Sequence, residues 1–157
     1  MIIRLMKEED VSYIAILEQR LYKNPWDEKS FRDELTKNKF SYLFVLTEND
    51  AILGYYGLWI IGDYATITKV SIMPELQNRG LGKILMEDLI KRCEAAEAVT
   101  IDLEVRESNY PAIALYHHFG FQSASVRKNY YQDGENAILM IKKLDKEESY
   151  ERIHIGN

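Results

Sequence analysis

The sequence predicts a mixed α/β or α+β fold, with helices on both faces of a central sheet. Some segments carry apolar residues at helical spacing, whereas others are runs of β-branched and aromatic residues bounded by turn residues. The two kinds of segment follow one another in the order β-α-α-β-β-β-α-β-α-β-β. A length of 157 residues is enough for one domain with a substantial core.

The first half of the chain predicts three antiparallel strands after a strand and two helices. A strand over 2–5 precedes an amphipathic helix, whose apolar residues recur at helical spacing: Val11, Ile14, Leu17 and Leu21. Asn24-Pro25 ends this helix, and Asp27 is the expected N-cap of a second one. Apolar runs over 42–47 and 51–61 predict a hairpin, and Gly62-Asp63 turns into a third strand that ends near Met73.

The second half predicts two more helices and three more strands. A helix over 81–96 carries the stripe Leu81, Leu85, Leu89 and Cys93, and a strand over 99–105 follows it. Pro111 starts a helix that ends at Phe119-Gly120. Strands over 122–131 and 135–143 then meet at an Asp133-Gly134 turn. We expect a folded domain over 1–144 and a loosely held, charged tail over 145–157.

Composition limits the possible partners. With 20 Lys+Arg against 25 Asp+Glu the net charge is −5, which disfavours a nucleic-acid binder and suits a cationic substrate. A single cysteine and three histidines without ligand spacing predict no metal site. No stretch approaches the roughly 20 apolar residues of a membrane span. The simplest interpretation is a cytosolic protein that does not enter a membrane.

The run Gln77–Lys83 lies between a predicted strand and a predicted helix and is typical of a pyrophosphate site. A helix N-terminus leaves backbone N–H groups unpaired and carries a partial positive charge, so phosphates bind there. Gly80 and Gly82 allow close approach of the backbone, and Arg79 and Lys83 add charge. The run has neither the GK[ST] ending of a nucleotide-triphosphate loop nor the spacing G-x-G-x-x-G. The alternative is a plain strand-to-helix turn with solvated charges.

Four motifs in order resemble a known family. They are Q-x-x-G-x-G at 77–82, the segment 103–109 with Ala112–Tyr116 and Phe119-Gly120-Phe121, the segment 127–131, and Asn24-Pro25-Trp26. Together, over roughly residues 2–142, they resemble the GCN5-related N-acetyltransferases (GNAT), and within that family the RimI-type ribosomal-protein-alanine N-acetyltransferases. The resemblance implies the GNAT fold, with a mixed, mostly antiparallel sheet, and acetyl-CoA as co-substrate.

The resemblance also implies which residues hold acetyl-CoA. Around the pyrophosphate it places Asn78, Arg79, Gly80, Leu81, Gly82 and Lys83. The strand residues Val70, Ser71 and Ile72 would bind the pantetheine arm through backbone groups, beside a β-bulge expected within 69–73. Asn109 would hydrogen-bond the cofactor or hold the junction between a strand and a helix.

Two residues match the family's acid and base. Glu104 shares a strand face with Thr100, Asp102 and Arg106, so it is either a solvated side chain or, by resemblance, the base that deprotonates the amine. An α-amino group has a pKa of about 7.7 to 8.0, so the base has to remove only one proton to give the neutral amine, and one carboxylate suffices. Tyr116 is either a half-buried aromatic or, by resemblance, the acid that protonates the departing sulfur.

By resemblance, the expected reaction is direct acetyl transfer to a protein N-terminus, with an alanine of a basic ribosomal protein as the expected acceptor. Trp26, Tyr130 and Tyr131 are ordinary aromatics or, by resemblance, walls of a peptide channel. Cys93 lies on an apolar stripe, so it is expected to fill the core and not to carry the acetyl group. The rivals are a GNAT enzyme acting on a small amine such as a polyamine or aminoglycoside, and a non-catalytic acyl-CoA-binding module.

Overall fold

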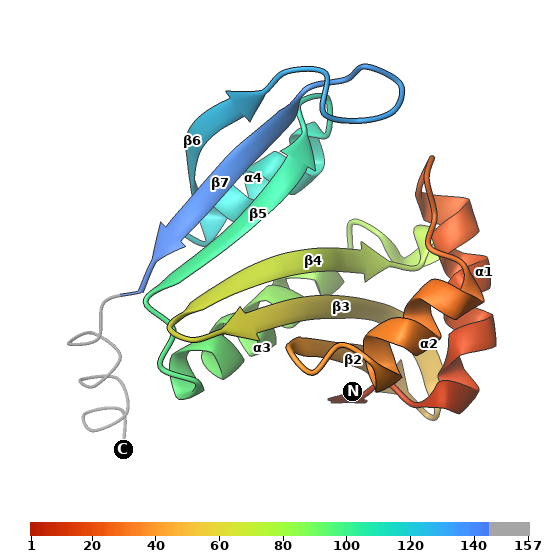
Figure 1. Ribbon diagram of the computed structural model, residues 1–157. Helices are drawn as coiled ribbons and strands as arrows, with labels where there is room; N and C mark the ends of the chain where they lie inside the picture. The colour runs from red at the N-terminus through yellow and green to blue at the C-terminus, as the bar shows by residue number, and fades with distance from the viewer. Residues whose placement is uncertain (145–157) are drawn as a thin grey trace. The chain divides into compact units, whose positions relative to one another are not determined.

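The computed structural model describes residues 1–144. Figure 1 shows its helices and strands, which follow the predicted order: β1 (Ile2–Leu5), α1 (Val11–Leu21), α2 (Glu28–Thr36), β2 (Ser41–Glu48), β3 (Ala51–Ile61), β4 (Tyr64–Ile72), α3 (Leu81–Ala95), β5 (Thr100–Arg106), α4 (Tyr110–His118), β6 (Gln122–Arg127) and β7 (Ala137–Lys143). Short 3-10 helices, Glu8–Asp10 and Pro74–Leu76, precede α1 and follow β4. The predicted tail over 145–157 lies outside the described residues.

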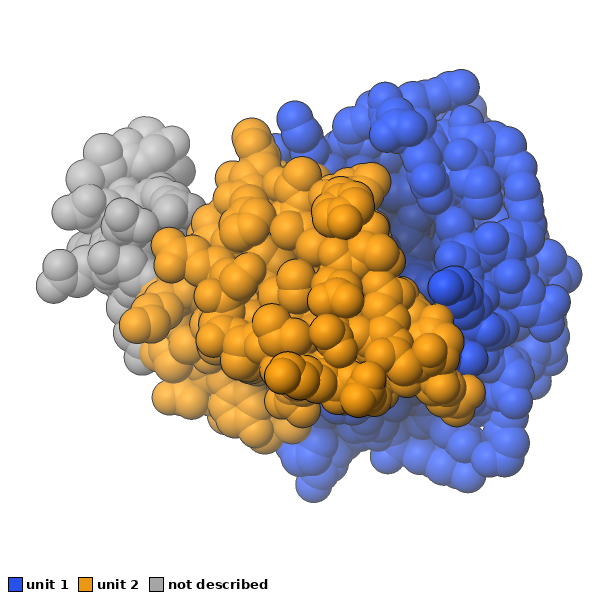
Figure 2. Space-filling model, turned by 90° about the horizontal axis from the view of Figure 1, so that it is seen from above, with its two compact units in different colours: residues 1–59, 68–89 blue, residues 60–67, 90–157 orange. Residues whose placement is uncertain are grey.

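The strands pair in the order β1-β2-β3-β4-β5-β7-β6. The pairs β1-β2, β2-β3, β5-β7 and β6-β7 are antiparallel, whereas β4 and β5 are parallel where residues 64–66 face 100–102. Contacts divide the chain into two compact units, which Figure 2 colours separately. Unit 1 is residues 1–59 and 68–89, and unit 2 is residues 60–67 and the chain from residue 90.

Unit 1 is built on an apolar core between its helices and strands. The stripe predicted for α1 is buried at Val11, Ile14 and Leu17, and it joins a cluster that includes Phe31, Leu43, Val45 and Tyr55. Asp27 caps α2 as predicted, since its Oδ1 accepts a hydrogen bond from the Ser30 N–H at 2.8 Å. The cap fixes where the chain turns between α1 and α2, and therefore the loop that carries Trp26.

Gly54, in β3, lies against the C-terminal end of β4. A Cβ atom at this position would stand 2.6 Å from the Ser71 carbonyl oxygen and 2.8 Å from Ile72 Cδ1. Both distances are shorter than a van der Waals contact, so only a glycine lets the two strands approach this closely. The position of Ser71 and Ile72 in unit 1 therefore depends on a residue without a side chain, Gly54, in the neighbouring strand β3.

Unit 2 shows the period-two alternation that the sequence predicts for β5. Residues Ile101, Leu103 and Val105 are buried, whereas Thr100, Asp102, Glu104 and Arg106 are only partly covered. Strand β5 pairs along its whole length with β7, where Glu104 faces Leu139 and Arg106 faces Ala137. In helix α4 the buried residue is Tyr116, whereas its neighbour Leu115 is only half-buried.

The last hairpin is shorter than predicted. Strand β6 ends at Arg127 and not at Tyr131, and β7 begins at Ala137 and not at Glu135. Asn129 adopts a positive φ of 53°, and its N–H donates to the Asn136 side chain at 2.9 Å instead of to a strand. Farther on, the Tyr131 N–H donates to the Glu135 carbonyl and the Gly134 N–H to the Tyr131 carbonyl. Residues 128–136 therefore form a loop closed by its own hydrogen bonds.

Candidate active site

The segment before α3 has the geometry of an anion site in unit 1. The chain passes through positive φ values at Asn78 (64°) and Gly80 (81°), and α3 begins at Leu81. The first amides of a helix have no acceptor within it, so the N–H groups that follow Gly80 are available to a ligand. Arg79 and Lys83 are exposed beside them, whereas Leu81 is buried and anchors the turn. This donor set fits a pyrophosphate.

The C-terminal end of β4 leads into this segment and is held by side chains. Gln77 Nε2 donates to the Ile72 carbonyl at 3.2 Å, so the glutamine of the Q-x-x-G-x-G motif ties the loop back to its strand. The Ser71 side chain is buried and hydrogen-bonds the Tyr22 hydroxyl at 2.5 Å, and that hydroxyl also lies 3.4 Å from the Val70 carbonyl. Binding of pantetheine by these backbone groups, and a bulge within 69–73, stay predictions.

A buried ion pair lies behind this strand and was not foreseen from the sequence. Lys69 Nζ is 3.0 Å from Glu18 Oε2, and the two side chains are 8% and 0% exposed. Glu18 also accepts from the Tyr55 hydroxyl at 2.7 Å and from the Trp26 backbone N–H at 2.9 Å. The pair thus joins α1, β3, β4 and the loop that carries Trp26. The Trp26 ring packs edge-on against Phe31 and lies 4.2 Å from the Lys69 ammonium.

Burial controls the titration of this cluster. It lowers the pKa of Lys69, although the carboxylate of Glu18 opposes the shift. About a third of Tyr22 is exposed, but its hydroxyl is enclosed, and burial raises the pKa of that phenol to about 12. Burial followed by the charge of Glu18 also raises the pKa of Tyr55. Both phenols therefore stay protonated and able to donate at neutral pH.

A charge in an apolar pattern is the signal that could have revealed this pair. Glu18 lies four residues after Ile14 and three before Leu21, on the apolar stripe of α1. Lys69 follows buried Ala65 and Ile67 at two-residue spacing along β4, so it lies on the same face of the strand. A carboxylate and an ammonium that both occupy core positions can be accommodated when they pair with each other.

In unit 2 the side chain of Glu104 meets two residues from the end of β6 and the loop after it. Arg127 Nε is 3.2 Å from Glu104 Oε1, and the two side chains are 51% and 24% exposed. A hydrogen bond to Glu104 raises the pKa of the Tyr130 phenol. The Tyr130 and Tyr131 rings pack edge-on, with centroids 5.1 Å apart. The structure thus brings together the predicted base and both predicted channel tyrosines.

The other two predicted residues of unit 2, Asn109 and Tyr116, lie at the two ends of α4. Asn109 is the N-cap of α4, since its side chain accepts from the Ala112 N–H at 3.3 Å. Holding the junction is therefore confirmed, and a contact of Asn109 with the cofactor stays a prediction. Tyr116 is 7% exposed, and its ring centroid lies 5.8 Å from that of Phe121. Its carbonyl accepts from the Phe119 and Phe121 N–H groups, which anchors the end of α4.

Three features of the described residues bear on alternative interpretations. Cys93 is fully buried on α3, and burial raises its pKa to about 12, so the thiol is neutral and enclosed. Within residues 1–144 no group of three or more His, Cys, Asp and Glu side chains could hold a metal ion. No helix in the same range is long and apolar enough to cross a membrane.

In unit 1 the start of α3 offers donors for an anion, and in unit 2 strand β5 displays a partly exposed carboxylate, which are features that the resemblance to the GNAT family predicts. The chain belongs to the acetyltransferase (GNAT) family, whose model matches residues 10–121. It therefore has the GNAT fold and is an acetyl-CoA-dependent N-acetyltransferase, as the sequence predicts.

Within this family the chain is similar to bacterial enzymes that are named for one protein substrate. The ribosomal protein bS18-alanine N-acetyltransferase of Salmonella typhimurium is 37% identical over 141 residues, which cover 88% of this chain and 94% of that protein. The enzyme of the same name from Escherichia coli K12 is 39% identical over 127 residues, which cover 79% and 84%. The crystal structure of the ribosomal-protein-S18-alanine N-acetyltransferase from Escherichia coli superimposes with a TM-score of 0.83 at 35% identity, covering 92% of this chain and 94% of that one.

The buried pair makes a prediction about stability. Changing Glu18→Gln or Lys69→Met alone should lower the free energy of unfolding by about 3–5 kcal/mol. The first change leaves the Lys69 ammonium buried without its carboxylate, and the second leaves the Glu18 carboxylate buried without its ammonium. The double variant should lose less than the sum of the two single variants. Urea denaturation measures the free energy of unfolding of the wild type, the two single variants and the double variant.

An exposed pair on α2 serves as the control. Lys29 Nζ and Asp33 Oδ2 are 2.8 Å apart, but 78% and 37% of their side chains are exposed, so Lys29→Met should cost under about 1 kcal/mol. Strictly additive losses at Glu18 and Lys69 would show that the two charges do not stabilise each other.

The anion site predicts a charge effect on cofactor binding. Acetyl-CoA at about a hundred times its Kd should stabilise the wild type by about 2.7 kcal/mol, and Arg79→Glu should reduce the shift in melting temperature because it repels the pyrophosphate. Lys91→Glu, an equal reversal at an exposed position late in the same helix, is the control. Thermal shifts of equal size in both variants would contradict a phosphate site at residues 78–83.

Proposed function

We propose that this enzyme acetylates the N-terminal α-amine, most of all an alanine, of a basic ribosomal protein. The observation that carries the proposal is the setting of Glu104: it is partly exposed on β5 and contacts Tyr130, next to Tyr131. A base beside adjacent aromatic side chains suits an amine at the end of an extended peptide. The names of the bacterial relatives support the same substrate. A net charge of −5 favours a basic partner.

The proposed mechanism is direct transfer in a ternary complex. Acetyl-CoA supplies the activated acetyl group, and residues 78–83 would hold its pyrophosphate. Glu104 accepts a proton from the α-ammonium group, which yields the neutral amine that can attack. A backbone N–H in the segment Val70–Ile72 would donate to the developing oxyanion. Tyr116 would donate the proton that the departing sulfur needs.

The assignment of Cys93 supports direct transfer over an acetyl-enzyme. A thiol that carries an acetyl group must reach solvent and ionise, and Cys93 does neither at neutral pH because it is fully buried with a raised pKa. Trp26 stays a predicted substrate contact, and its ring is partly covered by the apolar core of unit 1. We place the reaction in the cytoplasm, where a ribosomal protein is accessible, with neither nucleic acid nor membrane as partner.

The acid and base roles predict distinct kinetic defects. Glu104→Gln should lower kcat at neutral pH by about a hundredfold or more, with partial recovery at higher pH, where more of the amine is already neutral. Tyr116→Phe should also lower kcat but recover less, since a higher pH does not replace the lost acid. Steady-state rates from pH 6 to 10 measure both, and unchanged acetyl-CoA binding serves as the folding control. Wild-type rates in both folded variants would make the two residues structural.

The substrate proposal is tested with three amines. A basic peptide that starts with alanine should be acetylated fastest, and the same peptide with a blocked N-terminus and an internal lysine should react slowly, since a lysine pKa of about 10.4 leaves little neutral amine. Free spermidine is the third. Mass spectrometry locates the acetyl group. Equal rates on spermidine would favour the small-amine rival, and no turnover on any amine would favour a binding module.

A further inference from the structure

The 128–136 loop lies over the polar face of β5 and carries both channel tyrosines. Glu104 and Arg106 are two residues apart, so they project from the same face of the strand. Glu104 interacts with Tyr130 and raises the pKa of its phenol, and the Arg106 guanidinium lies 4.0 Å from the centroid of the Tyr131 ring. Each tyrosine is thus matched to one side chain of β5.

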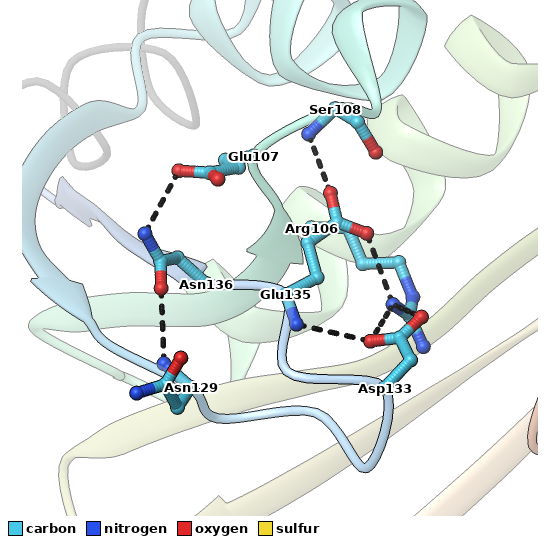
Figure 3. Close-up of polar contacts among 7 residues, drawn as sticks. All are labelled: Arg106, Glu107, Ser108, Asn129, Asp133, Glu135 and Asn136. Carbon is cyan, nitrogen blue, oxygen red and sulfur yellow. Dashed lines mark hydrogen bonds and ion pairs between the residues drawn. The ribbon is translucent and has the colours of Figure 1, made fainter.

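Arg106 ties this loop to the strand through two carboxylates. Its Nη1 lies 2.9 Å from Asp133 Oδ2 and 3.0 Å from Glu135 Oε1, and its side chain is 20% exposed. Figure 3 shows all three side chains directed at one another from the strand and the loop. Asp133 also accepts from the Glu135 N–H at 3.0 Å, and Glu135 from the Ser108 N–H at 2.9 Å. One guanidinium therefore organises a connected set of charged hydrogen bonds.

A second set of contacts closes the base of the loop without Arg106. Asn136 Oδ1 accepts from the Asn129 N–H at 2.9 Å, and Asn136 Nδ2 donates to Glu107 Oε2 at 3.2 Å (Figure 3). The Glu107 N–H donates to the Asn136 carbonyl at 3.2 Å. These bonds fix the ends of the loop. Backbone bonds between Tyr131, Gly134 and Glu135 close its middle, and the Arg106 contacts hold that middle against β5.

The loop has no strand or helix that would order this middle part. Fixing the backbone of a residue costs about 1–2 kcal/mol of conformational entropy, so a loop of this kind needs strong tertiary contacts to hold one conformation. Ion pairs to Asp133 and Glu135, with the guanidinium against the Tyr131 ring, are contacts of that kind.

We propose that Arg106 is a positioning residue, which holds the 128–136 loop so that Tyr130 and Tyr131 stand beside Glu104 and receive the substrate peptide. The proposal rests on the proposed function for the peptide, but the ordering of the loop does not depend on it. Arg106 itself takes no part in proton transfer. Its loss should therefore weaken peptide binding more than it slows the chemical step.

Arg106→Gln tests this, because glutamine leaves both carboxylates without a cation. Losing a charged hydrogen bond predicts about tenfold faster hydrogen exchange at the loop amides and about a tenfold higher KM for the alanine peptide. The KM for acetyl-CoA should stay unchanged, and kcat should fall by less than about twofold, because Glu104 remains in place. Arg106→Lys restores the charge but not the planar group, so it should recover part of both effects.

Arg4→Gln is the matched control. Arg4 makes an equivalent pair with Asp10 in unit 1, at 2.8 and 3.0 Å, and its side chain is 32% exposed. Its loss should lower the melting temperature but leave the loop amides and the peptide KM as in the wild type. If Arg4→Gln raises the peptide KM as much as Arg106→Gln, general destabilisation explains the effect and the proposal is wrong.

Hydrogen exchange separates this proposal from the proposed function, since it needs no turnover. Loop amides that exchange equally fast in the wild type and in Arg106→Gln would overturn the proposal, whatever the substrate. Faster exchange in the variant, together with a wild type that does not acetylate the alanine peptide, would keep Arg106 as the residue that orders the loop and reject the peptide substrate instead.

Discussion

Side-chain alternation along β5 imposes one arrangement on both the core and the chemistry of unit 2. Every second residue of the strand is buried, at Ile101, Leu103 and Val105, and pairing with β7 fixes the register. The intervening positions must then face the other way, and these include Glu104 and Arg106. A slip of one residue would bury both charges and expose the core residues, so the packing energy of the apolar face also fixes the direction of the predicted base.

Unit 1 must also hold the loop that carries Trp26 against a helix and two strands that are distant from it in the chain. The carboxylate of Glu18 accepts from Lys69, Tyr55 and the Trp26 backbone, so its charge is fully hydrogen-bonded although it is excluded from solvent. A buried ion pair contributes little net stability compared with apolar side chains of the same volume. Its value here is geometric, because no apolar group could fix the Trp26 backbone and the β4 strand in one arrangement.

Local patterns in the sequence predicted the order of elements, the Asp27 cap, the burial of Cys93 and the two faces of β5, because each depends on residues close together in the chain. The end of β6 was predicted too late. Residues 128–131 look like strand, but the Asn129 N–H bonds the Asn136 side chain, and Arg106, distant in sequence, lies over the Tyr131 ring. The same limit applies to Lys69, whose partner Glu18 is 51 residues away. Of the candidate site, the resemblance supplied the residue types, while their partners could come only from the fold.

The close approach at Gly54 also restricts how this sequence can change over evolutionary time. Any substitution there adds a Cβ atom against the Ser71 carbonyl, a backbone group that cannot rotate away as a side chain can. A tolerated replacement would have to move the end of β4, and with it the start of the segment that leads to α3. Position 54 therefore carries no chemistry of its own, yet selection should keep a glycine there unless the segment of the anion site moves as well.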